Sequence, residues 1–267
     1  MTFRDTPWPE GTPCWVEVLV GDQTRSSAFY AQLFGWTFVD HGPAYQHYLT
    51  ARLEGRAVAD IGPLPPGPPG PPAEGPPAWL VCLAVESADA AAERITEAGG
   101  ALELPPTDVG DHGRFAVARD PAGARFAVWQ ADTYLGAEVT GVPGSVVWYQ
   151  CRTTDPGAAA AFYTKVFGHT PGRVAGSGGG GGCDTLDLDG RPVAGLSGVD
   201  AGSAPEAEPS HWEVTFGVRD LDAAAARVTA LGGAVRGAPF ATPAGPSVPV
   251  TDPLGTPFHL LAVDGQD

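Results

Sequence analysis

The sequence predicts an α+β fold in which one β-α-β-β-β module occurs four times, with the modules paired into two tandem halves. The first observation is a helical motif that occurs twice, over residues 22–36 and 155–169, with Asp, Ala-Phe-Tyr and Phe-Gly at the same spacing. The second is that later landmarks of the first half, including an Asp-Pro-x-Gly turn, return about 133 positions further on. A chain of 267 residues with 43% hydrophobic content is long enough for two domains.

The repeated motif predicts a capped helix of about three turns in each half. Asp22 and Asp155 stand at its start, where a carboxylate accepts hydrogen bonds from backbone N–H groups that lack a helical partner. Gly35 and Gly168 stand at its end, where a left-handed residue terminates the helix. Apolar side chains between them fall on one face, which we expect to be buried.

The other elements follow from apolar or alternating runs between turn residues. In the first half we expect a second helix at 87–98, capped by Ser87, and strands at 14–20, 36–39, 45–53, 57–61, 79–85, 101–104, 113–118 and 125–130. In the second half we expect a helix beginning near Asp222 and strands at 146–152, 185–188, 192–196 and 212–218.

The connections between modules are rich in proline and glycine. Residues 62–77 read as a polyproline-like crossover, because most positions lack an N–H or have a fixed φ. Residues 176–182 form a glycine loop, and 201–209 form the second crossover. We therefore expect domains at 12–133 and 143–264, joined by a linker at 134–142.

Charge and cysteine content limit the classes of function. The net charge of −16 disfavours nucleic acid and anionic membranes as partners, and suits a cationic guest or simply an acidic soluble protein. Cysteines 14, 82 and 151 lie in apolar runs without a C-x-x-C pair, so we expect buried thiols. Without a signal-like or membrane-spanning segment, the expected location is the cytoplasm, as a monomer or homodimer.

Four such modules in tandem, with the Ala-Phe-Tyr…Phe-Gly helix and the Asp-Pro-x-Gly turn, resemble the vicinal oxygen chelate superfamily. This is the glyoxalase, bleomycin-resistance and dioxygenase group, and the resemblance covers about residues 12–263. Residues 13–17 and 190–195 resemble its actinobacterial two-domain branch, whose members are labelled glyoxalase-like or hydroxylases. The resemblance implies that two modules wrap around a small-molecule cleft, and that metal enzymes place one ligand on the first and last strand of each module.

Carried onto this sequence, the first-half ligand positions hold Trp15, Leu80 and Ala127, with Ala59 as the fourth. None of these side chains binds a metal, so the resemblance implies no metal there. Asp60 is adjacent to Ala59 and is expected to point to the other side of the strand.

In the second half the same positions hold Trp148, Ala194, Glu213 and His259. Glu213 and His259 are suitable ligands for Zn²⁺, Fe²⁺ or Mn²⁺, and Gln150 is a weak third candidate. The competing interpretation is a Glu–His hydrogen bond in a polar cleft. If modules one and four were paired instead, Glu17 would join Glu213 and His259.

Strand parity places a set of aromatic and polar side chains on the cleft-facing side. The set is Trp15, Glu17, Cys82, Trp129, Trp148 and Gln150. Our leading hypothesis is a protein that binds an aromatic or amphipathic ligand, cationic or neutral, and needs no metal to do so. The alternatives are a divalent-metal-dependent glyoxalase-like lyase, isomerase or oxygenase using Glu213 and His259, and a structural or signalling protein with vestigial clefts.

The remaining histidines are weaker candidates for site residues. Residues 41, 47, 112 and 169 are read as surface histidines, because they are scattered among loop-like or strand-edge positions. The glycine-rich loop that contains Asp111 and His112 could overhang the first cleft.

Overall fold

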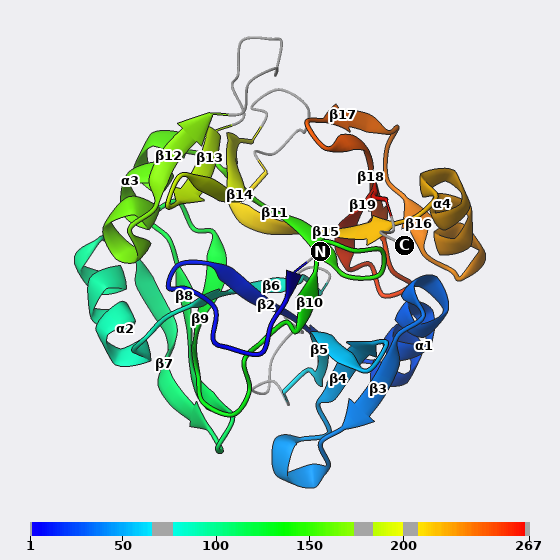
Figure 1. The fold of residues 1–267 in the computed structure, drawn as a ribbon, viewed down its shortest axis with the longest axis horizontal. Coiled ribbons are helices and arrows are strands. Elements are labelled where there is room, and N and C mark those ends of the chain that lie inside the picture. Colours follow the sequence, from blue (N-terminus) through cyan, green and yellow to red (C-terminus); the bar gives the residue numbers. More distant parts are fainter. Residues whose placement is uncertain (1, 66–76, 174–183, 200–207, 265–267) are drawn as a thin grey trace.

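The computed structural model describes residues 2–65, 77–173, 184–199 and 208–264. Two large curved sheets lie side by side, one from each half of the chain (Figure 1). Their order is β3-β4-β5-β2-β6-β9-β8-β7 in the first sheet and β12-β13-β14-β11-β15-β19-β18-β16 in the second, with β17 paired to β18. The predicted α+β fold of two tandem halves is confirmed.

The strands occur along the chain in the order that the predicted modules require. The first sheet contains β2 (Pro13–Val20), β3 (Thr37–Asp40), β4 (Leu49–Leu53), β5 (Arg56–Pro63), β6 (Leu80–Ala84), β7 (Ala101–Val109), β8 (Gly113–Arg119) and β9 (Arg125–Ala131). The second contains β11 (Val146–Thr153), β12 (Thr170–Arg173), β13 (Asp184–Leu188), β14 (Arg191–Gly198), β15 (His211–Val218), β16 (Ala234–Val235), β17 (Phe240–Thr242), β18 (Gly245–Thr251) and β19 (Pro257–Ala262).

Modules one and two share the first sheet, because β2 pairs antiparallel with β6. Modules three and four share the second sheet through the equivalent pair, β11 with β15. Pairing of module one with module four is therefore wrong, and Glu17 does not join Glu213 and His259. Each half therefore has its own sheet, and the cleft side of each sheet is the face opposite its helices.

In the described residues, four α-helices cover the outer faces: α1 (Gln23–Phe34), α2 (Ala88–Glu97), α3 (Pro156–Phe167) and α4 (Leu221–Ala230). Helices of different halves meet in pairs, α1 beside α4 and α2 beside α3 (Figure 1). The predicted caps are confirmed: Asp22 accepts from the Arg25 N–H and Asp155 from the Ala158 N–H. Gly35 and Gly168 are left-handed, as predicted.

The Phe and Tyr side chains of the repeated helix pack across the boundary between the halves. Phe34 of α1 packs against Phe216 of β15, with ring centroids 5.1 Å apart and planes tilted by 38°. On the other side, Phe126 of β9 lies 5.8 Å from Tyr163 of α3. One buried apolar cluster therefore includes residues of both sheets and all four helices.

Three segments differ from the predictions, and one of them is the strand expected at 101–104, which extends to Val109 as β7. Part of the expected strand at 45–53 is instead a short 3₁₀ turn, η1 (Pro43–Tyr45), followed by two residues with positive φ, so the strand β4 begins only at Leu49. The expected linker is ordered against the first sheet: β10 (Val139–Thr140) pairs with β1 (Thr2–Phe3), and the Ala137 N–H donates to the Cys14 carbonyl.

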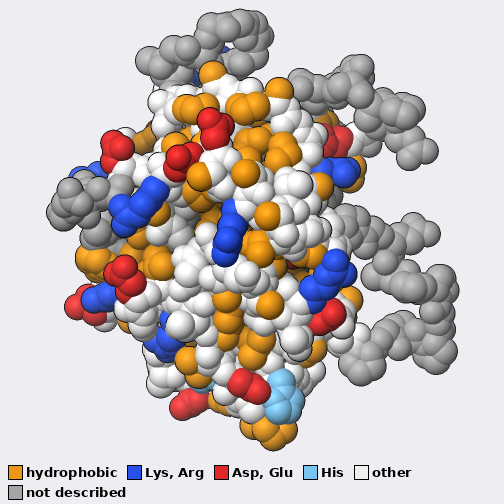
Figure 2. Space-filling model, turned by 90° about the vertical axis from the view of Figure 1, so that its right-hand side faces the viewer, with side chains coloured by type: hydrophobic (Ala, Val, Ile, Leu, Met, Phe, Trp, Pro, Cys, Tyr) orange, Lys and Arg blue, Asp and Glu red, His pale blue; other side chains and the backbone are white. Residues whose placement is uncertain are grey.

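Some expectations fall outside the described residues. These are most of both crossovers, the glycine loop at 176–182 and Cys183. The other three cysteines are buried free thiols, as predicted. On the face shown in Figure 2, acidic and basic side chains are scattered among apolar and small ones, and no basic patch gathers there. Among the described helices, none has the length and apolar character needed to cross a membrane.

Candidate functional site

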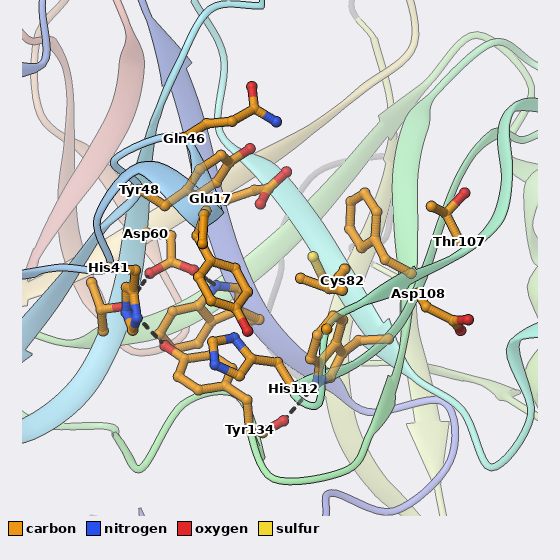
Figure 3. A pocket seen from close by; sticks show the side chains of 18 of the residues that line it. Glu17, His41, Gln46, Tyr48, Asp60, Cys82, Thr107, Asp108, His112 and Tyr134 are labelled. Atoms are coloured by element: carbon orange, nitrogen blue, oxygen red, sulfur yellow. Dashed lines mark hydrogen bonds between the residues drawn. The ribbon is translucent and has the colours of Figure 1, made fainter.

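The first sheet curves around a cavity of about 570 Å³ (Figure 3). Its inner wall is formed by side chains from neighbouring strands: Trp15 and Glu17 from β2, Asp60 from β5, Cys82 from β6 and Trp129 from β9. These residues meet because strand side chains alternate between the two faces, so one face of each strand points inward. Four of the side chains proposed from the sequence, those at 15, 17, 82 and 129, thus line one cavity.

Asp60 faces the cavity. The prediction that Ala59 lies on the cleft side of the strand and Asp60 on the other side was wrong, because the two residues have the opposite orientation. Ala59, not Asp60, packs into the core on the other side of β5. The parallel pairing of β2 with β5 places Glu17 opposite Asp60. Two carboxyl groups therefore project side by side into a space that is also lined by several aromatic rings.

The Asp60 carboxylate is fully engaged by neighbouring side chains. Its Oδ2 accepts a hydrogen bond from Trp15 Nε1 at 3.2 Å, and its Oδ1 accepts one from Thr50 Oγ1 at 2.7 Å. Because the Thr50 hydroxyl has a single proton and donates it to Asp60, it accepts from His41 Nε2 at 2.8 Å. A hydrogen-bonded chain thus runs from Asp60 through Thr50 to His41.

Glu17 differs from Asp60 in having no such partners. No hydrogen bond or ion pair joins its carboxyl to any described residue. Burial raises the pKa of Glu17 to about 7, and the nearby Asp60 charge adds to this, while Arg125 acts in the opposite direction. Burial also raises the pKa of Asp60 to about 7, against the opposing effect of its bonds from Thr50 and Trp15.

Aromatic rings from two loops and the inter-half segment close one side of the cavity. Tyr45 and His112 are stacked almost parallel, with centroids 4.6 Å apart and planes 4° apart. His112 also stacks on Tyr134 at 5.6 Å. Tyr134 in turn meets the edge of Trp15 at 5.2 Å, and its carbonyl accepts from Trp129 Nε1 at 2.8 Å.

Three of these residues were not found from the sequence as site residues. His41 and His112 were read as surface histidines but line the cavity, and Tyr134 lies in the expected linker. Of the three, only His112 had a sequence feature that indicated a place at the site, namely its position in a glycine-rich loop near the first cleft. His169 was also misread, because it is fully buried, with Nε2 2.8 Å from the Gly11 carbonyl oxygen.

The second cleft has different chemistry at the equivalent positions. Gln150 replaces Glu17, and Gly195 replaces Asp60 on the paired strand β14. The Gln150 side chain lies directly over Gly195, where an added Cβ would be only 2.0 Å from Gln150 Oε1. Gln150 accepts from Trp148 Nε1 at 3.2 Å and donates to Ser197 Oγ at 3.0 Å. This part of the second cleft is thus filled by its own hydrogen-bonded side chains.

Glu213 and His259 do come together, with Glu213 Oε1 3.9 Å from His259 Nε2. A third residue, His211, was missed and lies closer, its Nε2 3.3 Å from the same oxygen. Its Nδ1 donates to the Pro209 carbonyl at 2.8 Å. Burial would lower the pKa of His211, but these two interactions outweigh it and the pKa is raised.

The pKa values of Glu213 and His259 both shift downward. Burial would raise the pKa of Glu213, but the His211 hydrogen bond and the charges of His259 and His211 outweigh it, so the pKa is lowered. Burial lowers the pKa of His259, and the attraction of Glu213 only partly opposes this. The arrangement favours an ion pair between His211 and Glu213, while burial disfavours the protonated form of His259.

Metal-ion chemistry fits the first cleft poorly. Trp15, Leu80 and Ala127 carry no side-chain atom that coordinates a metal, and Asp60, beside the unpartnered Glu17, already accepts hydrogen bonds at both oxygens. The second cleft offers Glu213 and His259, but Glu213 is held by His211. Within the described ranges, no group of three or more His, Cys, Asp or Glu side chains is arranged to hold a metal ion.

Comparison with known proteins identifies the family. A profile of the glyoxalase/bleomycin resistance protein/dioxygenase superfamily matches residues 14–128, and a profile of the glyoxalase-like domain matches residues 148–261. The chain belongs to this superfamily, with one such domain in each half.

Curated relatives match over nearly the whole chain. The Streptomyces peucetius protein named "Anthracycline biosynthesis protein DnrV" is 39% identical over 268 residues, which cover 96% of this chain and 94% of that protein. The Mycobacterium tuberculosis protein named "Putative glyoxylase CFP32" is 35% identical over 272 residues, covering 97% of each.

Solved structures share the fold at low identity. The Mn(II)-bound glyoxalase from Novosphingobium aromaticivorans superposes with a TM-score of 0.63 at 16% identity, covering 94% of this chain and 82% of that one. The 2,3-dioxygenase LapB from Pseudomonas sp. KL28 gives 0.64 at 13% identity, covering 97% and 95%. At this identity the likeness concerns the fold alone.

Proposed function

We propose that the N-terminal cavity binds a planar aromatic or amphipathic small molecule and needs no bound metal to do so. The observation that carries this proposal is the wall itself: Trp15, Trp129, Phe115, Tyr48 and Tyr134 surround a space of about 570 Å³. Such a volume is in the range of small-molecule sites, and aromatic faces stack well on flat guests. The scarcity of free metal donors among these residues supports the metal-free part.

The curated relatives support the same chemical class. Two of them, from Streptomyces, are named for anthracycline biosynthesis. Anthracyclines contain flat fused rings, and a flat fused-ring guest matches the stacked and edge-on rings around this cavity. We therefore choose a fused-ring quinone, 1-hydroxyanthraquinone, as the probe.

The test is a calorimetric titration of the full chain and two matched variants with 1-hydroxyanthraquinone. Phe115→Ala removes a ring that lines the first cavity, and Phe240→Ala removes a ring that contacts His259 in the second cleft. We expect saturable binding at one site per chain, weakened about tenfold by Phe115→Ala and unchanged by Phe240→Ala. No saturable binding, or loss only in Phe240→Ala, would contradict the proposal.

The alternative is a divalent-metal-dependent lyase, isomerase or oxygenase that uses Glu213 and His259. The 3.9 Å approach of these two side chains favours it, as do related folds described as a Mn(II)-bound glyoxalase and a dioxygenase. It predicts about one tightly held ion per chain, lost in both Glu213→Ala and His259→Ala. Elemental analysis before and after chelation distinguishes this alternative from the metal-free binder.

A further inference from the structure

The N-terminal cavity is acidic as well as aromatic. Its lining includes Glu17, Asp60 and Asp108, whereas none of the described residues that line it is lysine or arginine. Asp108 forms an ion pair with Arg114 at the rim. Asp60 accepts hydrogen bonds at both oxygens. Glu17 is therefore the one carboxyl of the three that lacks a hydrogen-bond or ion-pair partner among the described residues.

We propose that Glu17 binds the protonated amine of an aromatic guest, so that the natural ligand class is a planar aromatic ammonium ion. The inference rests on the proposed function, because it assigns the charge of the guest that stacks in this cavity. Two interactions favour an ammonium ion at a carboxylate beside aromatic faces. The ammonium group forms an ion pair with the carboxylate, and aromatic faces attract cations within about 6 Å.

The surroundings of Glu17 explain why the guest must supply the partner. The groups that face it are Asp60 on β5, Tyr48 ahead of β4, Cys82 on β6 and, at longer range, Arg125 on β9. Of these only Arg125 is cationic, and its guanidinium is bound to Glu103 at 2.6 Å. His41 and His112 also line the cavity, and burial lowers the pKa of His41.

Binding of a cation at this carboxyl is coupled to proton release. The pKa of Glu17 is about 7 in the free protein. At about pH 7, therefore, about half of the molecules carry a proton on Glu17, and this proton must leave before an ion pair forms. Affinity for an ammonium guest should therefore rise about tenfold between about pH 6 and about pH 8, while the amine stays protonated. A neutral guest should show no such rise.

The experiment compares two probes of the same shape, 9-(aminomethyl)anthracene, which is cationic, and 9-(hydroxymethyl)anthracene, which is neutral. Both are titrated calorimetrically into the full chain at about pH 8. Glu17→Gln is the test variant, and it installs the residue that the second cleft has at the equivalent position 150. Glu93→Gln, on the exposed face of α2, changes the net charge equally without touching the cavity.

We expect the wild type and Glu93→Gln to bind the amine at least tenfold more tightly than the alcohol. Glu17→Gln should bind both probes equally, with the affinity of the wild type for the alcohol. Equal binding of both probes by the wild type would overturn the inference while leaving the proposed function standing. Equal weakening by Glu17→Gln and Glu93→Gln would also overturn it, since net charge alone would then explain the preference. Failure of both probes to bind would contradict the proposed function itself.

Discussion

Two buried tyrosines join the halves of the molecule through equivalent hydrogen bonds. Tyr30 of α1 donates to Asp252 Oδ2 at 3.3 Å, and Tyr163 of α3 donates to Asp120 Oδ2 at 3.2 Å. Each aspartate belongs to the Asp-Pro-x-Gly turn of the opposite half. The two sequence motifs that mark the repeat are thus partners in space, which neither motif reveals when read alone.

Tyr163 has a second role, because its hydroxyl accepts from Trp212 Nε1 at 2.9 Å. The equivalent Trp79 Nε1 lies near the Tyr30 hydroxyl but makes no hydrogen bond of normal geometry to any described residue. We therefore predict that Tyr163→Phe lowers the free energy of unfolding by about 2 kcal/mol and Tyr30→Phe by about 1 kcal/mol. Urea denaturation of the two variants measures the difference, and an equal loss in both would contradict this account.

The raised pKa of Glu17 makes a prediction about stability. An acid whose pKa is about 7 in the fold but 4.5 in the unfolded chain holds its proton more tightly when folded. The free energy of unfolding therefore decreases as pH rises from 4.5 to 7. Glu17→Gln removes this loss, so the variant should match the wild type near pH 4.5 and exceed it by about 3 kcal/mol near pH 8.

Denaturant midpoints of wild type and variant across this pH range provide the measurement. Glu93→Gln is the control and should follow the wild type throughout. A gain for Glu17→Gln that is the same at every pH would indicate a packing effect and would argue against a perturbed carboxyl.

At the scale of elements, helix starts and stops could be read from the sequence because each depends on local chemistry. Asp22, Ser87 and Asp155 cap helices as predicted, and Gly35 and Gly168 end them. Most strands of the first half could be predicted for the same reason, whereas β12, β16 and β17 of the second half were not expected. The beginning of β4 could not be predicted, because the turn around η1 has positive φ at Gln46 and His47. Glutamine and histidine do not by themselves indicate a positive φ.

The site was harder to predict than the elements. Trp15, Glu17 and Trp129 were placed on the cleft side because parity along a strand is local. Asp60 was misplaced, since a register error of one residue moves a side chain to the opposite face. His41 and Tyr134 reach the cavity from loops, and their positions depend on contacts between distant segments, such as the hydrogen bond from Trp129 to the Tyr134 carbonyl.

The cap at Asp155 gives a prediction for α3. Its side chain accepts from the Ala158 N–H at 2.9 Å and is exposed, so few other contacts depend on it. Asp155→Ala should lower the free energy of unfolding by about 1 kcal/mol, whereas Asp155→Ser should retain most of the stability. Thermal melts followed by circular dichroism test this, and equal destabilisation by both substitutions would show that capping is not the cause.

At the scale of the whole molecule, the two sheets share one aromatic core. Phe216 and Phe258 of the second half pack against Tyr30 and Phe34 of the first, with centroids between 5.1 and 6.2 Å apart. These rings would face water in an isolated half. The halves are therefore repeats in sequence that depend on each other for burial of their apolar surface.

This dependence predicts the behaviour of a truncated chain. Residues 1–142 alone should not form a folded monomer, and should aggregate, self-associate or remain unfolded, because the α1 aromatic face lacks its cover. Light scattering coupled to size exclusion, together with near-ultraviolet circular dichroism, provides the check. A monomer with a cooperative melt close to that of the full chain would contradict the shared core.

The central claim, that the first cavity binds a flat aromatic guest without a metal, is tested most directly on metal-depleted protein. The measurement is a titration with 1-hydroxyanthraquinone after exhaustive chelation, with metal content verified by elemental analysis. The account predicts one site per chain and an affinity within about twofold of the untreated protein. Loss of binding after chelation, with recovery on adding Mn²⁺ or Fe²⁺, would contradict it.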